Sequence, residues 1–199
     1  RGKLLRSVTV LDNDGDPDLN CGYLLFRNDN GHFTEVSQSV GFTPGPTMWF
    51  HEWLDYDNDG DMDFVKFLGG SQLFKNQGGT FVDASQEVSL DLFTRPHQAS
   101  CNTGDFDNDG DVDIFVQING GGDPDPEALL LNDVDESGNI SFVDVGFYAG
   151  MYTIGDRFGA TVLDYDMDIS DWVADRQLRG RGQGRYSHCA LDLPVFSTG

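Results

Sequence analysis

The nine residues Asp55-Tyr56-Asp57-Asn58-Asp59-Gly60-Asp61-Met62-Asp63 carry aspartate at most of their alternate positions. The pattern returns almost unchanged as Asp105-Phe106-Asp107-Asn108-Asp109-Gly110-Asp111-Val112-Asp113. A third copy, residues 10–18, has Val10 in place of the first aspartate. A fourth copy, residues 164–171, fits the pattern if its glycine has been deleted. The chain therefore repeats one acidic loop along its length.

Carboxylates packed this densely repel one another, by ~1 kcal/mol per pair in water and ~4 kcal/mol near a protein surface. A bound cation would offset that repulsion, and oxygen ligands without histidine or cysteine favour calcium over zinc or copper. Side chains at positions 1, 3, 5 and 9 would bind the ion, and position 7 would offer its backbone carbonyl. Glycine at position 6 permits the sharp turn. The alternative interpretation is a solvated acidic turn.

We therefore predict calcium sites in the two complete loops and a weaker site in the first loop; the fourth loop, without its glycine, must bend differently or not bind at all. The predicted metal-binding residues are Asp12, Asp14, Asp16, Asp18, Asp55, Asp57, Asp59, Asp61, Asp63, Asp105, Asp107, Asp109, Asp111, Asp113, Asp164, Asp166, Asp168 and Asp171. An EF-hand is excluded, because Lys66 and Val116 stand where its twelfth position needs glutamate. The apolar residues 64–68 and 114–118 that follow the two loops predict strands.

Corresponding aspartates recur about every 45–60 residues, a period typical of propeller blades. Each period also repeats an apolar segment such as Leu73-Phe74-Lys75-Asn76 and an aromatic segment such as Thr80-Phe81-Val82-Asp83. Four short strands with tight turns describe one antiparallel blade. We predict an all-β fold: a β-propeller, or part of one, built from four-stranded antiparallel blades. Phe33, Phe81 and Phe142 share one register and are expected to be core anchors between blades.

The propeller repeats are expected in residues 1–174, as segments 7–46, 47–97, 98–152 and a partial repeat at 153–174. Residues 175–199 form an Arg- and Gly-rich C-terminal segment, expected to be irregular. It could be a docking tail or the altered end of a longer array. Because propellers take about four to eight blades, three options stay open. The repeats form a compact four-bladed ring, belong to a larger propeller, or close through another chain.

The bulk composition excludes several classes of protein. A net charge of -22 disfavours nucleic acid as a partner, and no apolar run is long enough to span a membrane. The three cysteines form neither a metal-binding pair nor a disulfide framework, and Cys101 is expected to be a buried thiol. The chain opens on Arg1 without a signal peptide, so we expect a mature form or a fragment. Low-affinity calcium loops work where calcium is near millimolar, which predicts a secreted, extracellular or cell-surface protein.

Residues 158–166, Phe-Gly-Ala-Thr-Val-Leu-Asp-Tyr-Asp, resemble the Phe-Gly signature of the FG-GAP/VCBS repeat family, related to the calcium-bearing blades of integrin α-subunits. The Leu-Phe-Lys-Asn and Thr-Phe-Val-Asp segments resemble a subgroup found in large secreted bacterial proteins, often beside an ASPIC/UnbV segment. The resemblance covers residues 7–174 and implies a β-propeller with structural calcium in hairpins at its outer edge. It implies no single activity, because such a fold hosts many functions.

These features favour a non-enzymatic extracellular binding or adhesion module, in which calcium stiffens loops that engage a protein or a polysaccharide. One alternative is a polysaccharide lyase or hydrolase, for which His51, Glu52, Arg95 and His97 are available without a spacing that singles them out. Another is a structural subunit of an extracellular assembly. His51-Glu52-Trp53-Leu54-Asp55 begins like a zinc-protease helix, but Asp55 replaces the second histidine. No catalytic residue is therefore predicted.

Overall fold

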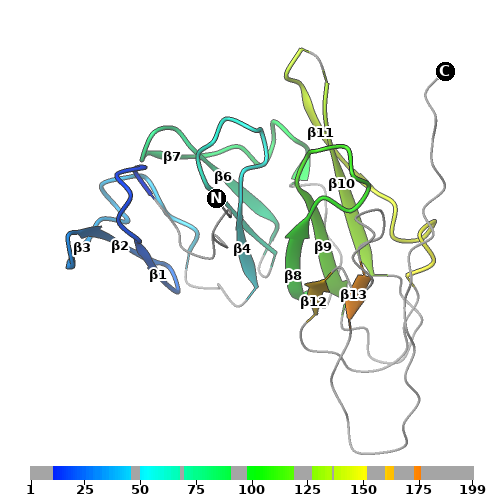
Figure 1. Ribbon diagram of the computed structural model, residues 1–199, viewed down its shortest axis with the longest axis horizontal. Coiled ribbons are helices and arrows are strands. Elements are labelled where there is room, and N and C mark those ends of the chain that lie inside the picture. Colours follow the sequence, from blue (N-terminus) through cyan, green and yellow to red (C-terminus); the bar gives the residue numbers. More distant parts are fainter. Residues whose placement is uncertain are drawn as a thin grey trace, which may run out of the picture. The chain divides into compact units, whose positions relative to one another are not determined.

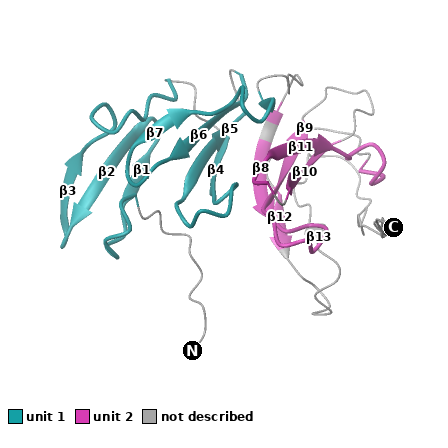
Figure 2. Ribbon diagram, turned by 90° about the horizontal axis from the view of Figure 1, so that it is seen from above, with its two compact units in different colours: residues 1–93 teal, residues 94–199 magenta. Residues whose placement is uncertain are grey.

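The structure, a computed structural model, describes residues 11–45, 50–67, 70–90, 98–118, 127–135, 137–151, 160–163 and 173–175. Its assigned elements are β-strands, and each sheet is made of antiparallel pairs of consecutive strands (Figure 1). The chain divides into two compact units, residues 1–93 and 94–199 (Figure 2). The predicted all-β, antiparallel fold is confirmed for the described residues. That part of the chain holds no helix of a length and hydropathy that could cross a membrane.

The first unit holds two sheets, each of which follows the order of its strands in the sequence. The first sheet contains β1 (Leu19–Cys21), β2 (Leu24–Asp29) and β3 (His32–Glu35). The second contains β4 (His51–Leu54), β5 (Asp63–Lys66), β6 (Gln72–Asn76) and β7 (Phe81–Asp83). The second acidic loop joins β4 to β5, so the predicted strand–loop–strand arrangement is confirmed here.

The second unit repeats this plan in a longer form. Its larger sheet has the order β11-β10-β9-β8, and a two-stranded sheet pairs β12 with β13. The strands are β8 (Gln98–Gly104), β9 (Asp113–Ile118), β10 (Ala128–Val134), β11 (Ile140–Asp144), β12 (Thr161–Leu163) and β13 (Val173–Asp175). The third acidic loop joins β8 to β9, as predicted.

The four-stranded antiparallel blade is confirmed for the second and third repeats. The first repeat shows three strands, since the segment before its acidic loop lies outside the described residues. The fourth repeat is described by β12 and β13, and apart from Asp175 the C-terminal segment 175–199 lies outside the description. Closure of the repeats into a ring stays a prediction.

A tight turn closes the hairpin of β2 and β3. Asn30 and Gly31 both have positive φ, 54° and 88°. Type I′ turns require positive φ at both central residues and match the twist of the flanking strands, which is why Asn-Gly is favoured there. The Asn30-Gly31 sequence therefore accounts for the tight turn of this hairpin.

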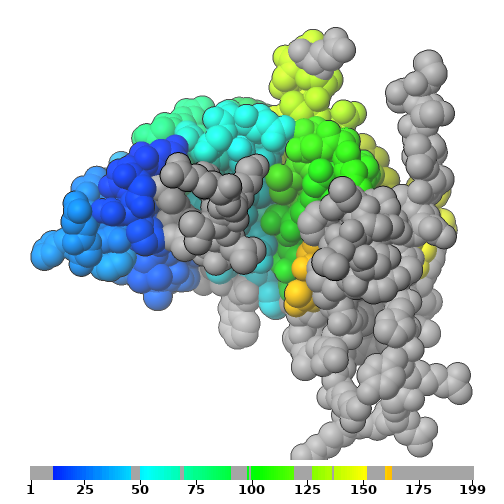
Figure 3. Space-filling view, in the orientation of Figure 1, coloured from blue at the N-terminus to red at the C-terminus, as the bar shows by residue number. Residues whose placement is uncertain are grey.

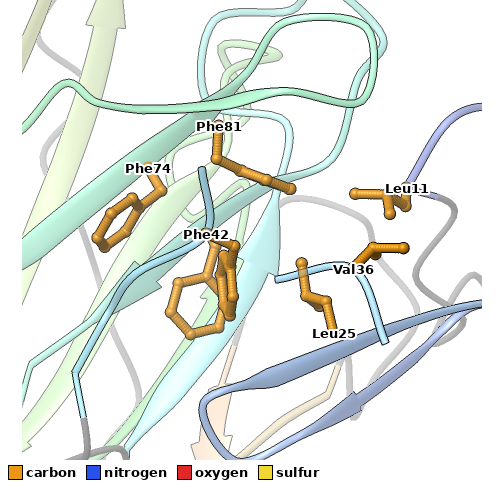
Figure 4. Packing of buried hydrophobic residues seen from close by; sticks show 7 residues of the cluster. Leu11, Leu25, Val36, Phe42, Phe74 and Phe81 are labelled. Atoms are coloured by element: carbon orange, nitrogen blue, oxygen red, sulfur yellow. The ribbon is translucent and has the colours of Figure 1, made fainter. Parts of the chain in front are cut away.

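The core of the first unit is centred on Phe42, in the turn that follows β3. Backbone hydrogen bonds shape this turn: Val36 N–H donates to the Leu25 carbonyl (2.9 Å) and Phe42 N–H to the Ser37 carbonyl (2.9 Å). The Phe42 ring is 1% exposed and packs on four aromatic rings of the second sheet. Figure 4 shows it beside two of them, Phe74 and Phe81. The centroid of the Phe42 ring lies 4.8 Å from Phe64, 5.3 Å from Phe81, 5.9 Å from Phe74 and 6.0 Å from Trp53.

This contact joins the first repeat to the second. The Phe81 N–H donates to the Val40 carbonyl (2.7 Å), and a Cβ added at Gly41 would meet the Phe81 carbonyl oxygen at 2.6 Å. Gly41 also has a φ of 77°, which disfavours other residues. Trp53 contacts the same cluster.

The turn that carries Phe42 recurs after the second and third blades. Ala84 N–H donates to the Leu73 carbonyl and Leu90 N–H to the Ser85 carbonyl, both at 2.9 Å. In the second unit, Val145 N–H donates to the Leu129 carbonyl at 2.8 Å and Met151 N–H to the Gly146 carbonyl at 3.1 Å. Phe42, Leu90 and Met151 therefore hold equivalent positions, and all three are buried. We did not predict this turn, although its apolar last residue recurs in the sequence.

The core of the second unit is built in the same way. Met151 joins Phe106, Phe115 and Leu129 in a buried cluster, against which Val162 of β12 packs. The third repeat is thereby tied to the first strand of the fourth. Cys101, in β8, is buried as predicted.

The expected core role of Phe33 is wrong, while that of Phe81 is confirmed. Phe81 is 3% exposed because Phe42 and the backbone of Val40 cover it. Phe33 stands at the same register position in the first sheet and is 52% exposed. Phe142 is half-buried. Burial at this position depends on the turn of a preceding repeat, and the described residues contain none before the first sheet.

We expect Phe42→Ala to lower the free energy of unfolding by about 3–5 kcal/mol, because it leaves a cavity among four rings. Phe33→Ala should cost about 1 kcal/mol or less, since half of that side chain is already in water. Urea unfolding followed by tryptophan fluorescence compares the two variants. Equal losses would contradict the central role of Phe42.

Candidate metal centre

The second and third acidic loops share one backbone conformation. Asn58 and Gly60 have φ of 58° and 91°, and Asn108 and Gly110 have φ of 60° and 103°. Such values suit glycine and are tolerated by asparagine. In both loops the glycine N–H donates to the first aspartate, from Gly60 to Asp55 Oδ2 and from Gly110 to Asp105 Oδ2, each at 3.1 Å.

This conformation brings carboxylates together. Oxygens of Asp55, Asp57 and Asp63 lie within 4.8 Å of one another in the second loop. In the third loop the same holds for Asp105, Asp107 and Asp109. The second loop therefore gathers positions 1, 3 and 9 of the pattern, and the third gathers positions 1, 3 and 5.

Several of these oxygens are buried without a hydrogen-bond donor. They are Oδ1 of Asp55, Asp57 and Asp105. A buried acceptor with no donor is costly, and three converging carboxylates add mutual repulsion. Oxygen-only ligands of this kind suit a hard cation such as calcium. The residues present therefore fit the predicted ion.

The aspartate at position 9 has a second role that sequence reasoning missed. Asp63 accepts hydrogen bonds from the N–H groups of Asn76 (2.7 Å) and Tyr56 (3.2 Å). Asp113 accepts equivalent bonds from Asn132 (2.8 Å) and Phe106 (2.6 Å). Both side chains are fully buried. The closing aspartate therefore fastens the acidic loop to the next hairpin of its blade.

The first loop uses its closing aspartate in the same way. Asp18 accepts hydrogen bonds from Asn28 N–H (2.8 Å) and Leu11 N–H (2.5 Å). The loop also shares the positive φ of its Asn and Gly, 59° at Asn13 and 95° at Gly15. The three loops are thus one structural unit at three places in the chain.

A family comparison agrees with this repetition. Residues 11–65 match the family described as FG-GAP-like repeat, a stretch that runs from the first acidic loop into β5. The chain contains an FG-GAP-like repeat. The resemblance to the FG-GAP family is thereby confirmed, whereas membership of the ASPIC/UnbV-associated subgroup stays a prediction. No curated protein matches the chain.

In each of the first three loops, the aspartate at position 7 contacts the following hairpin through its side chain. Asp61 Oδ2 accepts a hydrogen bond from Gly78 N–H (2.9 Å), and Asp111 Oδ2 accepts one from Val134 N–H (2.9 Å). Asp16 Oδ2 accepts one from Asn30 N–H (2.6 Å). This use of the side chain leaves the backbone carbonyl as the predicted metal contact at position 7.

Neighbouring FG-GAP-like repeats also touch through their loops. The Asn13 side-chain amide donates to Asp61 Oδ1 at 2.5 Å, and the Asn76 amide donates to the Leu11 carbonyl at 3.1 Å. The first and second loops therefore lie side by side in the first unit. A change in the conformation of one loop can therefore act on the other through these hydrogen bonds.

The first loop differs from the two complete loops. Within the described ranges, three converging carboxylates occur in the second and third loops and not among Asp12, Asp14, Asp16 and Asp18. Position 1 belongs to Val10, which lies outside these ranges. A weaker site in the first loop stays a prediction.

The fourth loop, with Asp164, Asp166, Asp168 and Asp171, lies outside the described residues. Its flanking strands are informative, because Leu163 pairs with Val173 where Leu54 pairs with Asp63 and Gly104 with Asp113. The strand position of the closing aspartate is therefore held by Val173. A site that includes Asp171 stays a prediction.

Burial sets the electrostatics of the loops. It raises the pKa of Asp63 to about 8 and that of Asp113 to about 7, against the opposing effect of the N–H groups that they bind. Burial also raises the pKa of Asp55, and the charges of Asp59 and Asp57 add to the effect. A nearby cation favours the ionised form of a carboxyl group, so a cation bound in these loops would oppose the upward pKa shifts.

The residues considered for an enzyme do not converge in the described part of the chain. His51 and Glu52 are neighbours in β4, so their side chains point to opposite faces of the sheet. Burial lowers the pKa of His51 and raises that of Glu52. Arg95 and His97 lie outside the described residues.

We expect Asn76→Ala to destabilise the protein by about 2–3 kcal/mol. The buried Asn76 amide donates to the carbonyls of Leu11 and Met62, and its oxygen accepts from Gly79 N–H, so truncation leaves buried groups unpaired. Asn20 is the matched control, because its amide also donates to two carbonyls, at a partly exposed site. Asn20→Ala should cost about 1 kcal/mol or less. Equal urea midpoints for the two variants would show that the hydrogen bonds of the Asn76 side chain do not have this stabilising role.

Proposed function

We propose that this protein is a calcium-stabilised binding module. The observation that carries the proposal is the convergence of Asp55, Asp57 and Asp63, where two buried carboxylate oxygens have no hydrogen-bond donor. The third loop supports it with a cluster of its own, Asp105, Asp107 and Asp109. Two independent repeats thus present an oxygen-only ligand set of the kind that calcium takes.

Calcium would act on the fold and not on a substrate. It would neutralise the converging carboxylates and hold the loop against the strand that begins at the closing aspartate. At a dissociation constant of ~0.1 mM and ~1 mM calcium, each site would add roughly 1.4 kcal/mol to the free energy of unfolding. Such a contribution is a substantial share of the stability of an ordinary domain.

The binding role rests on the FG-GAP-like repeat, which suggests a propeller-type binding module. Sites of millimolar to submillimolar affinity fill where calcium is abundant, so we propose a secreted or cell-surface location. The partner would be an extracellular protein or polysaccharide, bound by loops on a stiff sheet scaffold. The separation of His51 and Glu52 onto opposite faces favours a non-enzymatic role over a lyase or hydrolase.

We expect excess EDTA to lower the melting temperature by about 6–10 °C, because two sites lose their ions. Isothermal titration should show that Asp55→Asn and Asp105→Asn each remove one binding equivalent. Asp133→Asn is the matched control, since Asp133 is an exposed aspartate of β10 outside the loops. An unchanged melt in EDTA together with no heat of calcium binding would refute the proposed function.

A second candidate function is assembly through the first repeat, which is blue in Figure 3. Leu19 and Phe33 are about half exposed, at 50% and 52%. By register they correspond to Phe64 and Phe81 of the second sheet, which are buried beneath Phe42. The first sheet therefore presents an apolar face that suits the turn of another repeat of the same kind.

We expect the chain to gain mass with concentration in light scattering, and Leu19→Ser with Phe33→Ser to reduce this association. Burial of apolar area drives association, and the double variant replaces two large apolar side chains of this face with polar ones. Val143→Ser is the control, because Val143 is equally exposed in the second unit. A monomer at all concentrations, or an equal effect of the control, would argue against assembly through this face.

A further inference from the structure

Lys75 brings a positive charge into the second acidic loop. It lies in β6, and its Nζ contacts Asp57 Oδ2 and lies 3.4 Å from Asp59 Oδ2. These carboxylates occupy positions 3 and 5 of the loop. The Asp57 side chain is 8% exposed and that of Lys75 is 25% exposed, so the ion pair is largely shielded from water.

We propose that Lys75 is a tethered cation that competes with calcium for the second loop and lowers its calcium affinity below that of the third loop. This inference rests on the proposed function, because it concerns the same loops. It goes beyond that function by assigning unequal affinities to two loops of nearly the same sequence. It also identifies the residue that makes them unequal.

The competition follows from the shared carboxylate. Lys75 binds Oδ2 of Asp57, whereas Oδ1 of the same group is buried without a donor. An ion held by Asp55, Asp57 and Asp63 would face the ammonium across a single carboxylate. Two like charges at that separation repel strongly, because little water screens them. Calcium must therefore displace the ammonium or bind beside it, and either course weakens binding.

The third loop provides an internal comparison. Lys75 precedes Asn76, whose N–H binds Asp63; Leu131 precedes Asn132, whose N–H binds Asp113. In register, Lys75 pairs with Val82 and Leu131 with Val143. Leu131 thus stands at the position of Lys75, and its uncharged side chain packs against the core of the second unit. The third loop has no ammonium at that position.

The first repeat shows that a positive charge at this position need not reach the loop. Arg27 precedes Asn28 and corresponds to Lys75, but its guanidinium binds Asp29 at 3.2 Å. Asp29 belongs to β2 and not to the acidic loop. Among the ion pairs of the described residues, the pairs made by Lys75 are those that reach loop aspartates.

The ion pair would also support the second loop when calcium is scarce. An ammonium neutralises part of the loop charge without an ion, while the third loop keeps its full repulsion. The second loop would then stay folded over a wider range of calcium concentration. The third loop would be the one that responds to calcium at low concentration.

The test uses Lys75→Met, which keeps the length of the side chain and removes its charge. In an Asp107→Asn background, which disables the third loop, calcium titration reports the second loop. We expect the substitution to raise its affinity by about tenfold, the effect of removing one nearby like charge. Lys75→Arg should leave the affinity low. Arg27→Met, which removes a charge that does not touch the loop, should change it by less than about twofold.

A stability measurement separates competition from a purely structural role. Lys75→Met should lower the melting temperature in EDTA, where the ion pair is lost, and raise it in millimolar calcium, where binding is tighter. A structural role alone would lower both temperatures. An unchanged or reduced calcium affinity in Lys75→Met would overturn the inference while leaving the proposed function intact. Absence of calcium binding in both the parent and the variant would overturn the proposed function itself, and the inference with it.

Discussion

The repulsion between aspartates is the constraint around which each repeat is built. The loop conformation holds carboxylates of Asp55, Asp57 and Asp63 close together, although like charges destabilise a compact state. The aspartates of this cluster fall into two groups. Asp63 accepts hydrogen bonds from backbone N–H groups, whereas Asp55 and Asp57 each keep a buried oxygen without a donor. The hydrogen bonds of Asp63 stabilise the fold, and the oxygens without donors leave the loop suited to a cation.

The closing aspartate explains why loop and blade form together. Asp63, the first residue of β5, accepts a hydrogen bond from the N–H of Asn76 in the neighbouring strand β6, so the acidic loop is fastened to the hairpin that follows it. The Asn76 side chain then bonds to the backbone of the preceding repeat at Leu11. Side-chain hydrogen bonds of this kind satisfy buried backbone groups outside the sheet ladders. A cation bound in the loop would therefore act on several elements at once.

Contacts between repeats are made by the turn that follows a blade. The turn after each of the first three blades ends in a large apolar residue, and in the first unit Phe42 enters the aromatic face of the next sheet. In repeat proteins each unit relies on its neighbour to cover apolar surface. Leu19 and Phe33 of the first sheet are exposed, and the described residues contain no preceding turn to cover them.

Repeats of similar sequence are also distinguished by single residues. Lys75, Leu131 and Arg27 occupy one strand position in three repeats, yet they contact loop aspartates, a hydrophobic core and a strand aspartate respectively. The loop clusters differ as well, since Asp63 joins the second cluster whereas Asp113 is outside the third. Nearly identical loops can therefore differ in their response to the same ion.

Local sequence determined the repeated elements. The spacing of Asp55 to Asp63 and the glycine at position 6 predicted a turn between two strands, because backbone conformation there depends on adjacent residues. The aspartate pattern likewise predicted the second and third clusters. Tertiary structure decided which equivalent residues are buried and which aspartates Lys75 contacts. Those outcomes depend on contacts between segments far apart in the chain, which no local pattern encodes.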